Sequence, residues 1–265
     1  MTAQRRVVKT IKSWDFYPAA NFIKRMVVDL ITKLPLVTIK DSHDDLDKSV
    51  IMVLGGRTPD AAWFSKVAQG VDVWAADKGV EVCRSAGVVP DMLIGDCDSA
   101  SEQSWRWAID HGAQEARYQS DKDLTDFQLA LDIFRKKNTE CITRIFLTGA
   151  WGGRFDHLWS MIISFLNYSA PHVPFCIADE KEGLVIIDGP GEAEFTFEKK
   201  PKALSLISFS RECTGVSISG VRWPLDAVKL EYGFPYAVSN RAEDAKCVHV
   251  CCSCGRLGFY WVWSG

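Results

Sequence analysis

Five of the aspartates in the first half of the chain have a spacing that suits chemistry: Asp77, Asp96, Asp98, Asp123 and Asp126. Several carboxylates held close together repel one another unless a cation lies among them. Oxygen ligands without histidine or cysteine companions suit Mg²⁺ rather than Zn²⁺. In nucleotide chemistry, Mg²⁺ is usually held by a few acids, and phosphate oxygens complete its octahedron. The acids therefore predict a site for Mg²⁺ and phosphate.

Each acid also has a purely structural interpretation. A single aspartate after a strand commonly forms a turn or caps a helix, and this alternative stands for Asp77 taken alone. It is weaker for Asp96 and Asp98, because acids two residues apart in an extended segment point the same way and need a cation nearby. Asp123 or Thr125 can cap the helical pattern that follows them. That role explains one acid of this segment but not three.

The elements that must position these residues are short apolar runs separated by helical patterns. The helical patterns cover 60–69, 80–86 and 157–166, and the apolar runs cover 49–54, 71–76, 92–94 and 143–148. Strands and helices that alternate at this pitch predict an α/β fold with a mostly parallel sheet and helices on its faces. The carboxyl ends of such strands share one edge, where ligands bind. We therefore expect the scattered acids to meet at that edge.

Phosphate also needs hydrogen-bond donors, and two glycine-rich turns follow predicted strands. Gly55-Gly56 is followed by Arg57, and the segment 149–153 is followed by Arg154. Backbone N–H groups in such turns approach anions closely, and arginine adds bidentate contacts. A simple tight turn is the alternative for either glycine pair. Neither turn matches the Walker A motif or the dinucleotide G-x-G-x-x-G motif, so a dehydrogenase of the Rossmann type is disfavoured.

The second half of the chain has a different pattern of expected elements. Strand-sized segments recur there with turn residues between them, at 184–187, 193–198, 204–209, 216–218, 227–232, 236–239, 247–251 and 257–262. This pattern predicts a small antiparallel β-sandwich or barrel. We expect an N-terminal extension over 1–48, an α/β domain over 49–180 and a β-sandwich domain over 181–265.

Composition narrows the functional classes. The chain has 265 residues, a net charge of −3 and 47% hydrophobic residues, so neither a nucleic-acid partner nor a membrane is expected. Its nine irregularly spaced cysteines suit a reduced compartment, and we expect a cytoplasmic protein. The cysteines between 247 and 254 suggest zinc, but a strand with small buried side chains is favoured. The basic segment 1–28 suggests either an organellar transit peptide or an amphipathic helix with Val7, Ile11 and Trp14 on one face.

Several motifs together resemble the thiamine pyrophosphokinase family. Four of them match its catalytic core in order and spacing, at 76–79, 90–99, 122–126 and 152–157. Two more, Ser219–Leu225 and Val238–Asn240, look like the thiamine-binding segments of its C-terminal β domain. The resemblance covers roughly residues 49–265 and leaves the first 48 residues outside.

The resemblance implies an enzyme that moves the diphosphate of ATP onto the hydroxyl of thiamine and releases AMP. It implies a homodimer with active sites between subunits, Mg²⁺ bound by the five aspartates, and catalysis by Asp98, Asp126 and Arg154. Either Asp98 or Asp126 would accept the hydroxyl proton. Trp223 would stack on the pyrimidine of thiamine, from the partner subunit, with Ser239 and Asn240 nearby. The residues assigned to ATP are Gly55, Gly56, Arg57, Lys78, Thr125, Gly153 and Asp156.

One position departs from the family. This chain has Lys78 before Gly79, where the family usually has glycine. If that glycine provides positive φ or close approach to phosphate, Lys78 strains or blocks the turn. Alternatively, its ammonium group contacts phosphate. Two other functions therefore stay open: a related Mg²⁺-dependent diphosphotransferase with another alcohol, such as a pterin, and a thiamine- or nucleotide-binding protein weakened in catalysis.

Overall fold

The structure is a computed structural model. It describes residues 29–42, 48–96, 100–117, 124–137, 143–168, 175–243 and 247–263. Two predicted site residues, Asp98 and Asp123, lie outside the described residues, as does the segment with Val7, Ile11 and Trp14.

The first half of the chain forms a parallel sheet, as the alternating pattern predicts. Its strands are β3 (Lys48–Val53), β4 (Asp72–Ala76), β5 (Met92–Gly95), β6 (Gln114–Arg117), β7 (Thr143–Thr148) and β8 (Phe175–Ala178). They lie in the order β8-β7-β3-β4-β5-β6, and every neighbouring pair is parallel. β6 and β8, at the outer positions of this order, were not predicted from the sequence.

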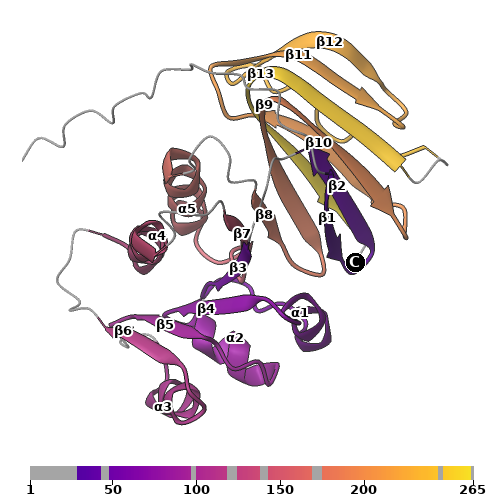
Figure 1. Cartoon of the computed structure of the whole chain (residues 1–265). Coiled ribbons are helices and arrows are strands. Elements are labelled where there is room, and N and C mark those ends of the chain that lie inside the picture. The colour runs from indigo at the N-terminus through magenta and orange to yellow at the C-terminus, as the bar shows by residue number, and fades with distance from the viewer. Residues whose placement is uncertain are drawn as a thin grey trace, which may run out of the picture.

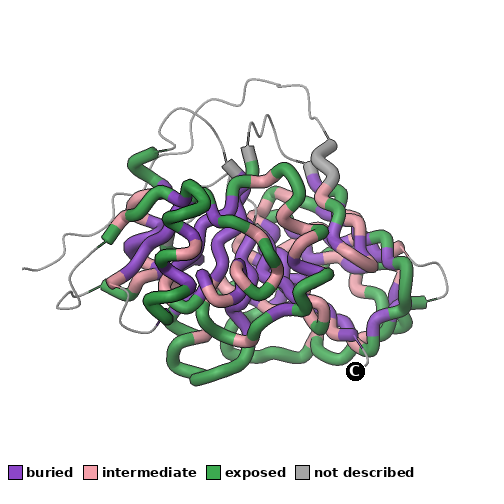
Figure 2. Tube along the Cα trace, turned by 90° about the horizontal axis from the view of Figure 1, so that it is seen from below, coloured by how far each residue is buried: buried purple, intermediate pink, exposed green. Residues whose placement is uncertain are grey.

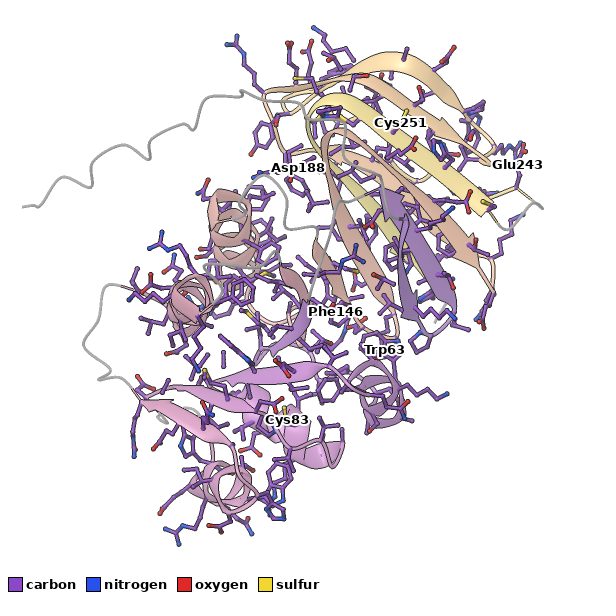
Figure 3. The ribbon with its side chains drawn as sticks, in the orientation of Figure 1. Trp63, Cys83, Phe146, Asp188, Glu243 and Cys251 are labelled. Carbon is purple, nitrogen blue, oxygen red and sulfur yellow. The ribbon has the colours of Figure 1, made fainter. Side chains whose placement is uncertain are left out.

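Helices cover both faces of the sheet. Successive side chains of a strand point to opposite faces, so the continuous apolar runs place apolar side chains on both of them. The helices are α1 (Ala61–Val67), α2 (Gly79–Ser85), α3 (Glu102–Asp110), α4 (Asp126–Lys137) and α5 (Phe155–Tyr168). One core lies between the sheet and α1 to α3, and a second lies under α4 and α5 (Figure 1). On the first face, Trp63 of α1 packs against Phe146 of β7 with ring centroids 6.2 Å apart (Figure 3).

The second half continues the same sheet with antiparallel strands. These are β9 (Glu182–Phe197), β10 (Ala203–Ser208), β11 (Glu212–Ser219), β12 (Leu225–Glu231) and β13 (Cys247–Val262). β9 and β13 pair along most of their length, with a register shift between Cys252 and Gly255. From the sequence, each of these two strands was expected as two short ones. The strand predicted at 236–239 is wrong, because the structure has a loop there.

An N-terminal hairpin joins this antiparallel half. It consists of β1 (Asp29–Leu34) and β2 (Val37–Ser42), and β2 pairs with β9. Residues that the sequence analysis set aside as an extension therefore belong to the sheet. The predicted domain boundaries at 48/49 and 180/181 stay predictions.

Aromatic side chains fill the core of the antiparallel half, which is sandwich-like. Phe195 and Phe259 have ring centroids 4.1 Å apart, and Phe197, Trp261 and Trp263 pack around them. Figure 2 shows buried backbone running through the middle of the molecule, with exposed backbone along its outer turns. Within the described part of the chain, no helix combines the length and the apolar character needed to cross a membrane. The cysteines from 247 to 254 lie on β13, so the strand is confirmed, but the predicted burial holds for Cys252 alone among them: Cys247 and Cys251 are half-buried and Cys254 is exposed.

Candidate functional site

The two glycine-rich turns meet beyond the carboxyl ends of β3 and β7. The N–H of Gly56 donates to the carbonyl of Gly149 over 2.6 Å, and the N–H of Arg57 donates to the carbonyl of Trp151 over 2.5 Å. Gly149 has φ +64°, and a Cβ there would lie 2.2 Å from the carbonyl oxygen of Leu54. The turns fit together because glycine allows both the conformation and the close approach.

Asp77 and Asp96 follow the neighbouring strands β4 and β5. The N–H of Asp77 donates to the carbonyl of Ile94 over 2.8 Å, and its φ is +49°. A Cβ on Gly95, the residue before Asp96, would lie 3.5 Å from the Cα of Asp77. The fold therefore brings these two acids to one edge, as their positions after strands predicted.

Lys78 adopts the right-handed helical region, with φ −57° and ψ −12°, and its side chain is exposed. The backbone strain considered for this position is therefore not present. The left-handed residue of the turn is Asp77, one position earlier. Lys78 instead accounts for the glycine at position 55. A Cβ on Gly55 would lie 2.6 Å from the Cβ of Lys78, which is too close. Contact between the Lys78 ammonium and phosphate stays a prediction.

Thr125 and Asp126 begin helix α4. Oγ1 of Thr125 accepts from the N–H of Gln128 over 3.2 Å, and Oε1 of Gln128 accepts from the N–H of Thr125 over 2.9 Å. This reciprocal pair is a capping box. It confirms the capping alternative for Thr125 and places Asp126 in the first turn of a helix that packs against β4 and β5.

The described acids form only part of the predicted metal site. Among the residues that the structure describes, no three side chains of His, Cys, Asp or Glu are close enough to hold a metal ion. The described candidates, Asp77, Asp96 and Asp126, offer only hard carboxylate oxygens, a donor set that fits Mg²⁺. Asp98 and Asp123 fall outside the described ranges.

Arg154 and Asp156 form an exposed pair at the start of α5. Nη2 of Arg154 lies 2.5 Å from Oδ2 of Asp156, and their side chains are 73% and 61% exposed. Hydrogen bonding to Arg154 lowers the pKa of the Asp156 carboxyl, and hydrogen bonding to Asp156 raises the pKa of Arg154. Gly153, just before them, has φ +69° and open space where a Cβ would point. A ligand can therefore approach this backbone and the neighbouring guanidinium from solvent.

Arg57 has protein partners that the sequence analysis missed. Its Nε donates to Oδ2 of Asp179 over 2.8 Å, and its Nη2 donates to Oε1 of Glu182 over 2.6 Å. Asp179 directly follows β8, so it lies at the same carboxyl edge as the predicted acids. The signal in the sequence was an acid after the apolar run Phe175–Ala178, a run too short for us to identify as a strand.

A second site forms in the antiparallel half, around Trp223 and Asn240. Nδ2 of Asn240 donates to the carbonyl of Trp223 over 2.8 Å, and Oδ1 of Asn240 accepts from the Trp223 N–H over 3.2 Å. Both residues line a cavity of about 190 Å³, with Ser205 and Tyr236 among its other walls. The N–H of Ser239 donates to Oγ of Ser205 over 3.1 Å. The fold thus brings the three predicted thiamine-binding residues together.

Trp223 presents its ring to solvent. It is 53% exposed, and the guanidinium of Arg222 lies over the ring, 5.0 Å from its centroid. This cation–π contact shows that the indole ring can hold a flat cationic group against its face. Arg222 and Tyr236 were not among the predicted site residues. The cavity lies among β10, β11 and β12, at the other end of the molecule from β4 and β5 (Figure 1).

Comparison with known proteins identifies related sequences for both sites. The family model "Thiamin pyrophosphokinase, catalytic domain" matches residues 66–177, and "Thiamin pyrophosphokinase, vitamin B1 binding domain" matches residues 192–257. The thiamine pyrophosphokinase of Bacillus subtilis is 30% identical over 165 residues, which is 62% of this chain and 75% of that protein. Thiamin pyrophosphokinase 1 of Caenorhabditis elegans is 24% identical over 161 residues, which is 59% of this chain and 64% of that protein.

Solved structures show the same fold at lower identity. The Bacillus subtilis thiamine pyrophosphokinase crystal structure superposes with a TM-score of 0.69 at 23% identity, covering 82% of this chain and all of that one. The yeast thiamin pyrophosphokinase structure superposes with a TM-score of 0.65 at 14% identity, covering 83% of this chain and 88% of that one. These matches support an α/β domain followed by a sandwich-like β part.

Proposed function

This chain belongs to the thiamine pyrophosphokinase family, and we propose that it transfers the diphosphate of ATP to the hydroxyl of thiamine and releases AMP. One observation carries the proposal. The catalytic-domain match contains the acids at the sheet edge, and the vitamin B1-domain match contains Trp223 and Asn240 beside their cavity. Each half of the reaction therefore has a site of suitable chemistry in the matching half of the chain.

ATP would bind where the two glycine turns meet. The open space beside Gly153 lets phosphate approach the backbone, and Arg154 next to it supplies positive charge. Lys78 is exposed on the adjoining turn and adds a second cation. These positions support the assignment of the glycine turns, Thr125 and Asp156 to the nucleotide side.

Asp77, Asp96 and Asp126, with Asp98 and Asp123, would hold Mg²⁺, because their carboxylates are the ligands this ion prefers. When bound, Mg²⁺ neutralises charge on the phosphate oxygens and makes the β-phosphorus more open to attack.

The protein's own groups then position the reactants and accept the proton that the hydroxyl releases. The hydroxyl oxygen of thiamine forms a bond to the β-phosphorus. The bond from that phosphorus to the oxygen that it shares with the α-phosphorus breaks, and AMP leaves with that oxygen. Asp98 or Asp126 accepts the hydroxyl proton, and Arg154 stabilises charge on the transferring group. Most of the rate enhancement comes from position and electrostatics.

We further propose a homodimer with active sites between subunits. The acids and the Trp223 cavity lie at different ends of one chain, so a second copy is the simplest way to bring them together. Exposed aromatic side chains at Trp223 and Phe234 support a partner on that side. We place the protein in the cytoplasm, without a nucleic-acid or membrane partner.

A complementation experiment tests the shared site. Chains carrying Asp77→Asn and chains carrying both Trp223→Ala and Asn240→Ala are assayed alone for their residual activity, and are then mixed after dissociation. A site built from both subunits regains about a quarter of the wild-type activity, because half of the random dimers carry one intact site. A site built within one chain regains none.

The activity itself is tested by AMP release from ATP with Mg²⁺. Release should require thiamine, and a pterin alcohol should neither replace nor outcompete it. AMP release that is indifferent to thiamine, or selective for the pterin, would refute the proposal. No release under any condition would favour a binding protein without catalysis.

A further inference from the structure

Arg57 closes a ring of contacts between the two glycine turns and the antiparallel half of the sheet. We call this ring the junction cluster; its members are Arg57, Trp151, Asp179, Glu182 and Tyr260. Arg57 donates to Asp179 and Glu182, and the hydroxyl of Tyr260 donates to the other oxygen of Glu182 over 2.5 Å. The Tyr260 ring meets Trp151 edge-on, with centroids 6.0 Å apart. The carbonyl of Trp151 accepts from the Arg57 N–H, which completes the ring.

The cluster joins four separate segments of the chain. Arg57 lies after β3 and Trp151 after β7, so each belongs to one glycine turn. Asp179 and Glu182 flank the turn between β8 and β9, and Tyr260 lies on β13. A second contact joins the segment after β3 to the β8–β9 turn: the N–H of Asp60 donates to Oε2 of Glu180 over 2.9 Å. The glycine turns are therefore held from outside, by the β8–β9 turn and by β13.

The charges in the cluster are mutually satisfied. The side chain of Asp179 is 1% exposed, and its carboxylate accepts three hydrogen bonds, from Nε of Arg57 and from the N–H groups of Lys181 and Glu182. Nη2 of Arg57 also lies 2.6 Å from Oδ2 of Asp179. Burial acts against the charged guanidinium, but hydrogen bonds from Arg57 to Glu182 and Asp179 leave its pKa raised. Burial raises the pKa of Asp179, which opposes the ion pair. We take the pair as ionised, because three hydrogen-bond donors and the adjacent guanidinium favour the anion.

Tyr260 also connects the cluster to the thiamine side. It lies opposite Ser205 of β10, and Oγ of Ser205 accepts from the Ser239 N–H. Burial and the hydrogen bond to Glu182 raise the pKa of the Tyr260 hydroxyl, so it stays protonated and keeps donating to Glu182. Strand pairing thus links the junction cluster to β10, the strand that lines the Trp223 cavity.

We infer that Arg57 is a positioning residue: it holds the two glycine turns in their ATP-binding geometry through Asp179, Glu182 and Tyr260, rather than by binding phosphate itself. This inference rests on the proposed function of those turns. Positioning matters here because a displacement of about 1 Å at a reacting group costs roughly 100-fold in rate.

The test separates support of the turns from direct contact with phosphate. Tyr260→Phe removes a hydroxyl whose partner in the cluster is Glu182, and Arg57→Gln removes the guanidinium. Glu102→Gln and Arg106→Gln are the matched controls, because these two residues form an exposed ion pair on α3, away from the ring. For each variant we would measure the Kd of ATP with Mg²⁺ by calorimetry, kcat, the KM of both substrates, and Tm.

We expect Arg57→Gln to lower kcat/KM for ATP by about 100-fold and Tyr260→Phe by about tenfold, with the KM of thiamine nearly unchanged. The double variant should resemble Arg57→Gln alone, because both residues act through Glu182. Arg57→Lys should fall between Arg57→Gln and wild type, since one ammonium cannot serve two carboxylates in the same geometry. The controls should stay within about twofold of wild type.

Two results would overturn the inference. In one, Tyr260→Phe keeps wild-type ATP affinity and kinetics while Arg57→Gln loses them, which means direct phosphate contact. In the other, Tyr260→Phe lowers Tm alone, which means a merely structural role. A wild-type chain that binds ATP but ignores thiamine would refute the proposed function, and the ATP affinities would still decide this inference. A wild-type chain without ATP affinity would refute both.

Discussion

Replacing Asp41 by Asn should destabilise the protein strongly, because it leaves a buried guanidinium without its counter-charge. Nη2 of Arg144 lies 2.8 Å from both carboxylate oxygens of Asp41, and the two residues are 7% and 6% exposed. Nη1 of Arg144 also donates to Thr32. Because Arg144 lies on β7, the pair and Thr32 tie the β1–β2 hairpin to that strand of the parallel sheet.

The magnitude follows from burial. Breaking one side of a buried ion pair costs about 3–5 kcal/mol of unfolding free energy. The entropy of unfolding is roughly 2.1 cal/mol/K per residue, or about 560 cal/mol/K for 265 residues, so Tm should fall by about 5–9 °C. Differential scanning calorimetry at constant pH and protein concentration measures this shift.

Two controls sharpen the measurement. The double variant Asp41→Leu with Arg144→Met should lie near wild type, because an apolar pair replaces a costly buried ion pair. Glu102→Gln breaks an ion pair with Arg106 whose side chains are 84% and 70% exposed, and it should move Tm by less than about 2 °C. If the Tm of the Asp41→Asn variant lies within 2 °C of the wild-type Tm, the hairpin does not depend on this pair and the reasoning is wrong.

Four further predictions concern the two candidate sites. Asp77→Asn should lower Mg²⁺-dependent AMP release by about 100-fold or more without changing the far-UV circular dichroism spectrum; near-normal release would remove Asp77 from the metal site. Trp223→Leu should raise the KM of thiamine by about 3–10-fold while leaving the KM of ATP alone, and an unchanged thiamine KM would place the substrate elsewhere. Thr125→Ala should cost about 1 kcal/mol of stability by removing the cap of α4, measurable by urea denaturation. The Asp156 carboxyl should titrate below its usual range in an NMR pH series, so its pairing with Arg154 persists above that low pKa and is lost as pH falls through it; Arg154→Gln should return the pKa of Asp156 toward its ordinary value.

Local patterns were enough to predict the central strands and the edge at which their acids gather. β3, β4, β5 and β7 are apolar runs followed at once by polar or glycine residues, and such runs form buried parallel strands in many contexts. β6 has the sequence Gln-Glu-Ala-Arg and is mostly exposed, so it carries no apolar signal. Only its pairing with β5 makes it a strand.

The long strands and the partners of the charged residues required the folded chain. The Gly189-Pro190-Gly191 segment has the composition of a turn, yet β9 runs through it, because β13 pairs with it on both sides of the register shift. Arg57 and Asp179 are 122 positions apart. The sequence alone determined that an arginine follows the first glycine turn and that acids follow the strands. Which of these charges pair with one another, and which face a ligand, depends on how the sheet brings distant strand ends together. The spacing of residues along the chain does not contain the distances between those strand ends in space.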